Sequence, residues 1–491
     1  MPLSALWSFG PFRRGVHPAD HKAAGASIRR MAFAPRLTLP LSQSVGAPSL
    51  PVVRVGQEVV RGELIAEAAG WVSVPLHAPA SGVIEAIALR PTARGAWMPS
   101  IVLRVFEAST QAVLWRAPAD LDALDQKGLV AAVQATGLVG LGGAAFPTHV
   151  KLSPPAGSSI HTLVVNGCEC EPYLTCDHRV MLERTEELIA GIRLAMRIVG
   201  AHHARIGIED NKPDAIARLR EKLVDDAAIE VCAVPARYPQ GAEKILIQSL
   251  FGIELGAGHL PAEAGIAVNN VGTLAALGRL MPAGEGLIER VITFAGPGIA
   301  RPGDYWVPLG TPLRFALDQV GAFNPDNPSG RIRHKNPVRG EPVEPQAPFD
   351  KLRANGFLAN GLSGFKSPGI EEMEVILGGP MMGAPVASLD VPITKGVSGL
   401  LVFPRALVAE HDARKTSACI KCGECLRVCP MRLNPSQLGL LAAKGEYEQM
   451  EALHLSNCFE CGCCAYVCPA NLPLVQRFRT AKGILRERAT A

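Results

Sequence analysis

Aromatic residues and strong net charge are both scarce in this 491-residue sequence. Phe, Trp and Tyr together make up 5% of the chain, whereas it contains 49 Gly and 40 Pro. This composition favours many turns and close approaches of the backbone to ligands. Lys and Arg number 49 against 45 Asp and Glu, without long runs of one sign, so a nucleic-acid-binding surface is not expected to be the main function.

A long uninterrupted hydrophobic run is also missing. The N-terminal segment MPLSALWSFGPFRRG lacks the apolar core and the small-residue cleavage site of a signal peptide, which predicts that the chain stays in the cytoplasm. The most apolar window, residues 128–146, contains several glycines and Gln134 and runs into Pro147, so we do not expect it to cross a membrane. Thirteen cysteines in a cytoplasmic protein indicate metal ligands or redox groups rather than disulfides.

The chain is too long for one ordinary domain, and its pattern divides it into five parts. We expect an extended arm at 1–34, an all-β module at 35–110, an α/β domain at 120–285, a β-rich domain at 286–405 and a helical cysteine-rich domain at 406–485. Apolar runs between turn signals predict the strands of the all-β module, among them 52–55, 64–66, 70–74, 82–84 and 101–105. The polar, Pro- and Gly-rich stretch 324–370 is predicted to be a disordered or loosely ordered surface insertion.

The all-β module resembles the barrel-sandwich hybrid of biotinyl and lipoyl carriers. The resemblance rests on the segments Val55-Gly56-x-x-Val59 and Ala78-Pro-Ala-Ser-Gly82-Val-Ile84. The carrier lysine between two hairpin strands is missing, because no lysine lies between Lys22 and Lys127. We therefore expect a structural module rather than a swinging arm.

Alternating strands and helices follow from about residue 120. Residues 162–165 are predicted to form a strand that ends in a loop. They are followed by a helix at 182–199, a strand at 205–208, a helix at 215–223 and a strand at 229–234. This order is typical of an α/β domain. Beyond it, 291–295 and 374–377 are predicted strands of the β-rich domain.

Two repeated cysteine runs near the C-terminus carry the most specific signal. Each has the spacing C-x2-C-x2-C-x3-C-P, the first ending at Pro430 and the second at Pro469. In this spacing, three thiolates of one run bind three corners of a [4Fe–4S] cubane, and the fourth iron is bound from the other run. We therefore assign one cluster to Cys419, Cys422, Cys425 and Cys468, and the other to Cys458, Cys461, Cys464 and Cys429.

The alternative for these runs is a pair of structural zinc sites, because C-x-x-C pairs also bind zinc. Tetrahedral zinc rarely uses four cysteines within eleven residues, so two clusters are favoured. Cys463 lies out of register and is interpreted as a buried thiol. Residues 435–455 between the runs are rich in helix formers, which predicts a helical domain around the cysteines.

A glycine-rich loop, residues 140–143 (GLGG), is followed by Pro147 and Lys151. The sequence contains G-x-G-x-x-A, but Pro147 would interrupt the helix of a Rossmann motif and no clear strand precedes the loop, so a Rossmann loop is not expected. Three glycines let the backbone approach a ring or a phosphate closely, and Lys151 supplies a positive charge. A glycine-rich turn without a ligand is the alternative.

A second loop, residues 166–173 (NGCECEPY), follows the predicted strand at 162–165. Because α/β folds bind ligands at the carboxyl ends of strands, its two carboxylates and its amide are suited to ribose hydroxyl groups. Solvated acidic residues without a ligand are the alternative. Cys168, Cys170 and Cys176 have no fourth partner of clear spacing and are interpreted as thiols that line the site.

These two loops and the segments 238–244 (YPQGAEK) and 268–271 (VNNV) resemble the flavin- and NADH-binding segments of the respiratory complex I flavoprotein subunit. Their order, with the β-module before them and the double cysteine run after them, more closely resembles the C subunit of the Rnf (Rsx) ion-translocating electron-transport complex. The resemblance covers most of residues 10–325 and 372–485. The insertion at 324–370 is foreign to that family.

The resemblance implies a non-covalent FMN and an NADH-binding site in the α/β domain, beside the two [4Fe–4S] clusters, and a β-grasp-like fold for the β-rich domain. Glu169 and Glu171 are implied to face the nicotinamide nucleotide. No catalytic acid or base is implied, because the chemistry belongs to the cofactors. The residues implied to lie near the cofactors are Gly140, Gly142, Gly143, Phe146, Lys151, Asn166, Glu169, Glu171, Tyr238, Gly241, Glu243, Asn269 and Asn270.

The implied function is that of an NADH-linked oxidoreductase subunit in a membrane-bound, ion-translocating complex. It would lie peripherally on the cytoplasmic face of the inner membrane, without a span of its own, and its partners would be the integral-membrane and iron–sulfur subunits of the complex. One alternative is a flavin-free electron relay or adaptor subunit, whose α/β domain only docks partners. A cluster-based sensor that binds DNA would need a basic recognition helix, and the sequence contains none.

Overall fold

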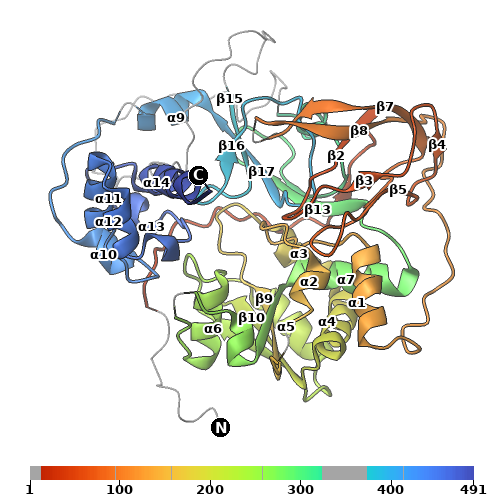
Figure 1. The fold of residues 1–491 in the computed structure, drawn as a ribbon, viewed down its shortest axis with the longest axis horizontal. Coiled ribbons are helices and arrows are strands. Elements are labelled where there is room, and N and C mark those ends of the chain that lie inside the picture. The colour runs from red at the N-terminus through yellow and green to blue at the C-terminus, as the bar shows by residue number, and fades with distance from the viewer. Residues whose placement is uncertain are drawn as a thin grey trace.

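The computed structural model describes residues 13–322 and 373–490, apart from residues 94, 156, 257 and 413. The predicted insertion and the first part of the predicted arm therefore lie outside the described residues. In Figure 1 the N-terminal β-module lies at the upper right, the α/β domain below it, and the helical C-terminal domain, residues 414–490, at the left. Within the described ranges, no helix combines the length and the apolar character that a membrane span needs.

The N-terminal module consists of two small sheets. One sheet has the order β2 (Arg36–Pro40), β8 (Trp97–Val105), β7 (Gly82–Pro91) and β4 (Glu58–Val59), and the other has the order β3 (Leu50–Pro51), β5 (Leu64–Glu67) and β6 (Leu76–His77). Alternating side chains of the longer strands, such as Leu37, Ile84 and Leu103, are fully buried in the main core. This two-sheet arrangement is the barrel-sandwich fold that the sequence predicted.

Two of the predicted strands in this module are wrong. Residues 52–55 and 70–74 form turns and irregular backbone. Gly70 has a φ of +126°, which is incompatible with a strand. Val52, Val55 and Trp71 are about half exposed, so these apolar residues lie on the surface and do not belong to a sheet face.

The α/β domain contains a four-stranded parallel sheet. Its order is β11 (Ile229–Val234), β10 (His203–Glu209), β9 (Thr162–Gly167) and β12 (Ile266–Asn270). From β9 the chain proceeds outward to β10 and β11 and then returns to place β12 on the other side of β9. The topological switch point, where open α/β sheets bind ligands, therefore lies between the carboxyl ends of β9 and β12.

Helices flank this sheet and precede it in the chain (Figure 1). The predicted helix at 182–199 is in fact two helices that meet at Arg184, α3 and α4. The helices are α1 (Gln126–Ala135), α2 (Thr148–Lys151), α3 (Cys176–Glu183), α4 (Thr185–Val199), α5 (Pro213–Lys222), α6 (Glu243–Phe251), α7 (Val271–Ala283) and the 3-10 helix η2 (Pro261–Ala264).

The β-rich domain is built on a six-stranded mixed sheet. Its order is β1 (Arg29–Arg30), β14 (Gly303–Pro308), β13 (Glu289–Ala295), β17 (Gly399–Pro404), β15 (Met373–Leu377) and β16 (Ala384–Pro385). The central pair, β13 and β17, is parallel, and each has an antiparallel neighbour. In chain order the four inner strands are β13, β14, β15 and β17, and helix α8 (Leu313–Gln319) lies between β14 and β15. This strand order and this helix position are those of a β-grasp fold.

The C-terminal domain is helical, as predicted. Its helices, after α9 (Arg405–Asp412), are α10 (Glu424–Val428), α11 (Pro435–Lys444), α12 (Tyr447–Ala452), the 3-10 helix η5 (Leu455–Asn457), α13 (Cys463–Tyr466) and α14 (Leu474–Thr490). The predicted helical stretch 435–455 is interrupted because Gly445, with a φ of +76°, ends α11. Leu438, Met450 and Phe478 form part of a separate small core.

Residues 13–30 connect three of the domains. The amide of Gly15 donates to the carbonyl of Val428 in the C-terminal domain (3.0 Å), and Val16 exchanges two main-chain hydrogen bonds with Tyr238 in the α/β domain (2.8 and 3.0 Å). Farther along, Lys22 donates to the carbonyl of Glu171 (2.8 Å). The segment ends in β1, which pairs with β14, so the predicted arm ties the C-terminal, α/β and β-grasp-like domains together.

Candidate functional site

Two asparagines stand at the switch point of the parallel sheet. Asn166, near the end of β9, donates from Nδ2 to the carbonyl of Gly241 (2.8 Å) and accepts from the amide of Cys168 (3.0 Å). Asn270, at the end of β12, caps helix α7 by accepting from the amide of Thr273 (3.1 Å). These bonds fix the loops that follow both strands.

The neighbouring Asn269 has an unused hydrogen-bond donor. Its side chain is 4% exposed, and its Nδ2 atom has no partner. A buried polar group without a partner costs roughly 1–3 kcal/mol, so such groups in a folded protein need an explanation. A bound ligand with oxygen or nitrogen acceptors would satisfy this donor, and FMN carries such acceptors on its ring and its phosphate.

The glycine loop lies against the start of α7. Its conformation is held by a hydrogen bond from the Gly140 amide to the Phe146 carbonyl (2.8 Å) and by one from the Leu141 amide to Thr273 Oγ1 (2.9 Å). A Cβ atom on Gly142 would lie 3.3 Å from Asn270. Gly143, with a φ of +109°, has open space on that side. The loop therefore presents bare backbone beside Asn270, as close contact with a flat or phosphorylated ligand requires.

Two of the predicted cofactor residues pair directly. Lys151 Nζ, at the end of α2, lies 2.6 Å from Glu243 Oε2 at the start of α6. Their side chains are 39% and 35% exposed, so the ion pair itself contributes little to stability. It links the end of α2 to the start of α6, although 92 residues separate the two side chains.

The two carboxylates of the second loop are both engaged by main-chain amides. Glu169 is 6% exposed and accepts from the amides of Asp177 (2.9 Å) and His178 (3.3 Å) in the first turn of α3. Glu171 accepts from the amides of Met381 (2.9 Å) and Met382 (2.8 Å). Burial raises the pKa of Glu171 to about 7. A role of either carboxylate toward a nucleotide stays a prediction.

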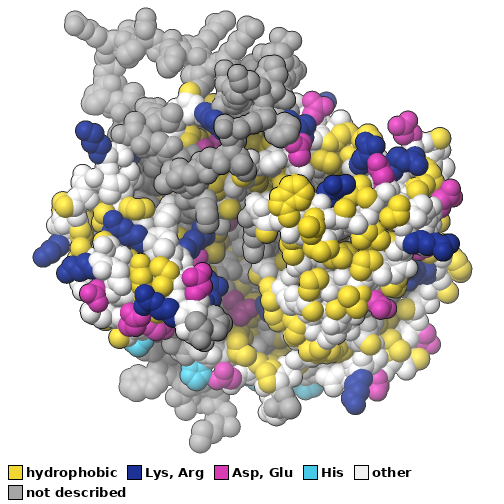
Figure 2. Space-filling view, turned by 45° about the horizontal axis from the view of Figure 1, so that its top comes forward, with side chains coloured by type: hydrophobic (Ala, Val, Ile, Leu, Met, Phe, Trp, Pro, Cys, Tyr) yellow, Lys and Arg dark blue, Asp and Glu magenta, His cyan; other side chains and the backbone are white. Residues whose placement is uncertain are grey.

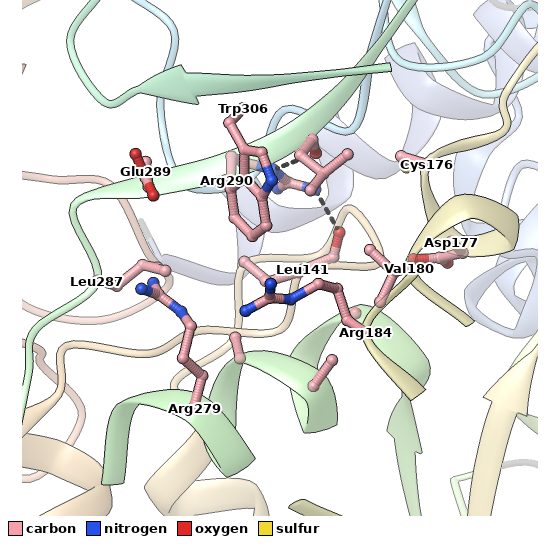
Figure 3. Close-up of a pocket in the computed structure, with 14 residues that line it drawn as sticks. Leu141, Cys176, Asp177, Val180, Arg184, Arg279, Leu287, Glu289, Arg290 and Trp306 are labelled. Atoms are coloured by element: carbon pink, nitrogen blue, oxygen red, sulfur yellow. Dashed lines mark hydrogen bonds between the residues drawn. The ribbon is translucent and has the colours of Figure 1, made fainter. Parts of the chain in front are cut away.

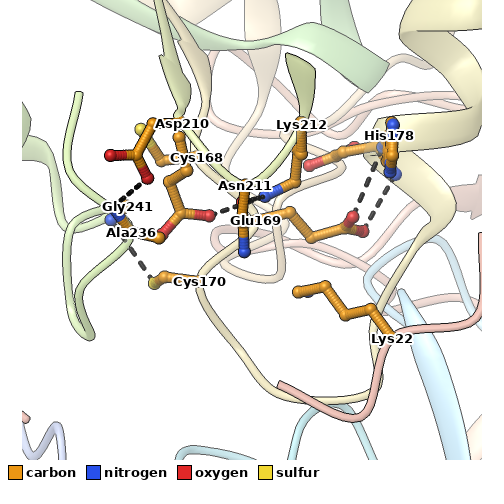
Figure 4. A network of polar contacts seen from close by, with 12 residues as sticks. Lys22, Cys168, Glu169, Cys170, His178, Asp210, Asn211, Lys212, Ala236 and Gly241 are labelled. Carbon is orange, nitrogen blue, oxygen red and sulfur yellow. Dashed lines mark hydrogen bonds and ion pairs between the residues drawn. The ribbon is translucent and has the colours of Figure 1, made fainter. Parts of the chain in front are cut away.

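A buried polar network lies beside these carboxylates (Figure 4). Lys212 Nζ and Glu209 Oε2 form an ion pair at 2.7 Å with side chains 1% and 2% exposed. Lys22 reaches the same region from the arm, and its pKa is lowered by burial, an effect that the charge of Glu169 opposes. Burial raises the pKa of the Cys170 thiol, so this cysteine is a neutral thiol at pH 7. The Glu209–Lys212 pair was not predicted from the sequence, although it directly follows the predicted strand at 205–208, where α/β folds place functional residues.

A hollow of about 500 Å³, including space open to solvent, lies behind the glycine loop (Figure 3). Arg184 and Arg279 point into it, with guanidinium carbons 5.7 and 5.8 Å from the centre of the Trp306 ring. Arg290 donates to the Leu141 carbonyl (3.0 Å), which joins the wall of the hollow to the glycine loop. No motif pointed to this hollow, because its residues come from separate elements.

The first set of predicted cluster ligands surrounds one hollow in the C-terminal domain. This hollow of about 380 Å³, open to solvent in part, is lined by Cys419, Cys422 and Cys425 of the first run and by Cys468 of the second. Gly423, with a φ of +81°, makes the tight turn that such convergence needs. Four separated thiols around a shared space suit a cubane, in which each binds a different iron.

The second set also gathers across the two runs. Burial and then the charges of Cys461, Cys458, Cys429 and Cys425 raise the pKa of the Cys464 thiol, so Cys464 lies near cysteines of both runs, including Cys425 of the first set. Gly462, with a φ of +86°, repeats the turn of Gly423. Among the described residues, no three His, Cys, Asp or Glu side chains gather closely enough for a single metal ion.

Tyr238 joins this second set to the α/β domain. Its side chain is buried, and its hydroxyl group donates to the carbonyl of Cys461 (2.7 Å). The Cys463 thiol is fully buried, with its sulfur 4.0 Å from the Tyr238 carbonyl. The predicted cofactor residue Tyr238 is therefore directed toward the cysteines.

Comparison with known families agrees with this arrangement. Residues 10–107 match the family described as the RnfC barrel sandwich hybrid domain, residues 133–279 match the Nuo51 FMN-binding domain, and residues 418–472 match a 4Fe-4S dicluster domain. The fold and the site thus define a flavin- and iron–sulfur-containing electron-transfer protein.

Curated relatives identify the family more closely. The chain is 38% identical to the C subunit of the ion-translocating oxidoreductase complex of Rhodobacter capsulatus, over 98% of this chain and 84% of that protein. It is 36% identical to the C subunit of the Na+-translocating ferredoxin:NAD+ oxidoreductase complex of Acetobacterium woodii, over 96% of both chains. For the C subunit of the proton-translocating complex of Clostridium ljungdahlii, the identity is 37% over 89% of this chain and 86% of that protein. The chain belongs to this family of C subunits of ion-translocating electron-transport (Rnf) complexes.

These matches confirm the predicted family, the barrel-sandwich, flavoprotein-like and double-cluster domain types, and the predicted cofactors, FMN and two [4Fe–4S] clusters. They also confirm an oxidoreductase subunit that works within a larger complex. The individual cofactor-binding residues and the domain boundaries stay predictions.

Proposed function

We propose that this subunit transfers electrons between NAD(H) and its partner subunits, with FMN in the crevice between β9 and β12 and the two clusters held crosswise by the cysteine runs. The observation that carries the proposal is the unpartnered Nδ2 atom of Asn269 at the switch point, one residue before Asn270, against which Gly142 of the glycine loop lies. A structural turn without a ligand would not need to leave a buried donor unsatisfied.

Different residues around the crevice contribute to FMN binding in different ways. Gly142 and Gly143 allow close approach, Asn269 donates a hydrogen bond, and Lys151 neutralises negative charge. Asn166, Gly241, Glu243 and Asn270 position the surrounding loops through the contacts described above. When bound, FMN exchanges a hydride with NAD(H) and single electrons with iron–sulfur clusters.

We further propose that the subunit is peripheral, attached to the cytoplasmic face of the inner membrane by integral-membrane subunits. The names of the relatives support a membrane complex that moves ions, and none of the described helices suits a membrane span. The relatives are named for different ions, H+ and Na+, so the family does not fix the ion.

A flavin-free relay or adaptor is the second candidate. The observation in its favour is that the carboxylates of Glu169 and Glu171 already accept hydrogen bonds from main-chain amides of this chain, which leaves them less able to bind a nucleotide. In that case the α/β domain would dock partners without binding a nucleotide.

Anaerobic purification followed by flavin extraction and NADH titration separates the two candidates. We expect about one FMN per chain, and bleaching of the flavin and cluster absorbance on addition of NADH. Protein with intact clusters, but with neither flavin after reconstitution nor NADH-dependent bleaching, would be the adaptor.

A further inference from the structure

The carboxylate of Glu171 is bound by a loop of the β-grasp-like domain. Residues 378–383 (GGPMMG) join β15 to β16, and the amides of Met381 and Met382 donate to Glu171 Oε2 (2.9 Å) and Oε1 (2.8 Å). Successive main-chain amides that point at one anion form a nest, and hydrogen bonds to a charged group are among the stronger ones in proteins. A Cβ atom on Gly379 would overlap Glu171 Oε2, so the loop fits closely around this carboxylate.

Both sides of this contact are held by further hydrogen bonds. Gly378, with a φ of +90°, makes the turn after β15, and its amide donates to the carbonyl of Gly399 in β17 (2.8 Å). On the other side, Lys22 of the arm donates to the carbonyls of Glu171 (2.8 Å) and Leu174. The contact therefore joins two well-anchored segments of different domains.

The same loop 378–383 also contacts the surroundings of the second cysteine set. Met381 is fully buried in a small core that includes Tyr238, Cys461 and Cys463. Burial and then the charge of Glu171 raise the pKa of the Tyr238 hydroxyl group, so the carboxylate lies near that residue. Figure 2 shows the charged side chains of the C-terminal domain on its outer surface, at the left of the view. The buried, apolar side of this domain faces loop 378–383 and the α/β domain.

We propose that Glu171 is a positioning residue, which, through loop 378–383, holds the loop 166–173 of the flavin crevice at a fixed distance from the second cysteine set. This inference rests on the proposed function, because it needs FMN in the crevice and a cluster on those cysteines. In the step concerned, one electron leaves the reduced flavin and enters the oxidised cluster. Glu171 itself exchanges neither an electron nor a proton.

A positioning role and direct binding of the nucleotide affect different steps. Both oxygens of Glu171 already accept a main-chain hydrogen bond. Loss of a nucleotide-binding group would raise the KM for NADH and slow the reduction of the flavin. Loss of a positioning contact would instead slow the later transfer to the cluster, because such rates fall steeply when reacting groups are displaced by even a small distance.

The test uses the full-length holoprotein, mixed anaerobically with NADH. Flavin bleaching is followed by stopped flow, and the cluster signal that depends on Cys464 is followed by freeze-quench EPR. Glu171→Gln replaces one accepting oxygen with a donor, and Gly379→Ala pushes on the same carboxylate from the opposite side. The matched controls are Glu63→Gln, which changes a carboxylate bound by one amide in the N-terminal module, and Gly483→Ala, which adds a methyl group in open space on α14.

We expect Glu171→Gln and Gly379→Ala to bleach the flavin at the wild-type rate, with a KM for NADH within about twofold of the wild type, but to reduce the cluster roughly tenfold more slowly or worse. The double variant should be no slower than the slower single variant, because both changes break one contact. Hydrogen–deuterium exchange at the amides of Met381 and Met382 should become faster in Glu171→Gln. The two controls should match the wild type in every measurement.

A raised KM for NADH with unchanged cluster reduction would make Glu171 a nucleotide-binding residue and overturn the inference, as would wild-type cluster reduction in both variants. If Glu171→Gln does not retain its clusters, Gly379→Ala decides. A wild type that holds no flavin, or whose flavin is not bleached by NADH, would refute the proposed function, and the inference with it. Normal bleaching with unaltered cluster reduction refutes the inference alone.

Discussion

The hydroxyl group of Tyr238 donates a 2.7 Å hydrogen bond to the carbonyl oxygen of Cys461. This contact joins the segment 238–244 of the proposed flavin crevice to an assigned cluster ligand 223 residues away. Both residues are buried. Hydrogen bonds and burial around the ligands tune the reduction potential of an iron–sulfur cluster, so this bond lies where the α/β domain can influence the cluster.

Replacement of Tyr238 by Phe should lower the potential of the cluster assigned to Cys458, Cys461, Cys464 and Cys429. The lost O–H dipole has its positive end toward the ligand loop, and its removal makes the added electron less stable. A bond of roughly 1 kcal/mol corresponds to about 40 mV for one electron. A redox titration followed by EPR measures the change. Tyr447→Phe, on α12, is the control, and unchanged potentials in Tyr238→Phe would contradict the assigned role of the bond.

Asn269→Ala should weaken FMN binding by about tenfold, because it removes a donor that only a ligand satisfies. In the flavin-free protein the same change breaks no hydrogen bond of Nδ2 and removes a buried donor without a partner, so it should not lower the thermal stability as Asn166→Ala does. Asn166→Ala provides the contrast. It breaks the bond to the Gly241 carbonyl and should lower the stability by roughly 1 kcal/mol. Fluorescence titration with FMN and thermal melts of both variants check this, and unaltered FMN affinity in Asn269→Ala would count against the crevice.

Lys151→Met should also weaken FMN binding, with little effect on stability. Its partner Glu243 is partly exposed, and such ion pairs contribute roughly 0–1 kcal/mol. The matched control is Arg193→Met, because Arg193 forms a similar exposed pair with Asp226 (2.9 Å) away from the crevice. If both variants keep the same flavin content after gel filtration, Lys151 has no part in holding the cofactor.

Local pattern was enough to predict three strands of the α/β sheet, β9, β10 and β11, but not β12. The run at 162–165 is buried in a parallel sheet and forms a continuous segment without charged residues, whereas the edge strand at 229–234 alternates between buried and exposed side chains. The cysteine spacing likewise predicted that Cys468 of the second run lies around the same hollow as the first three cysteines of the first run. Both signals depend on residues that are close in sequence or follow a fixed spacing.

Contacts between distant segments could not be predicted in this way. Glu171 meets the amides of Met381 and Met382 across 210 and 211 residues, and no local pattern reports such a partner. The apolar residues at 52–55 and 70–74 led to a wrong prediction of strands, because the pattern of apolar residues does not show which side chains are buried in the folded protein.

Lys395 provides a pH-dependent prediction. It is fully buried and donates to the carbonyls of Pro75 (2.9 Å) and Gly137 (2.6 Å), and it has no carboxylate partner among these contacts. Burial lowers its pKa to about 7 from the value of 10.5 that applies to the unfolded chain. Between these values the unfolded chain binds one proton more than the folded protein, so the stability rises with pH.

The melting temperature of the wild type relative to Lys395→Met should therefore increase as the pH is raised from about 7 to about 10. The comparison cancels the titration of the other groups. Lys127→Met, at an exposed position of α1, should show a constant difference from the wild type. A constant difference for Lys395→Met as well would mean that Lys395 keeps an ordinary pKa.

The central claim, two [4Fe–4S] clusters ligated crosswise by the cysteine runs, is tested most directly by EPR of dithionite-reduced, anaerobically purified single-cysteine variants. Cys468→Ala and Cys425→Ala should alter or abolish the same cluster signal, while Cys429→Ala and Cys464→Ala affect the other signal and Cys463→Ala leaves both intact. If Cys468→Ala instead abolishes the signal that depends on Cys464, or if the wild type contains zinc and no iron, the account is wrong.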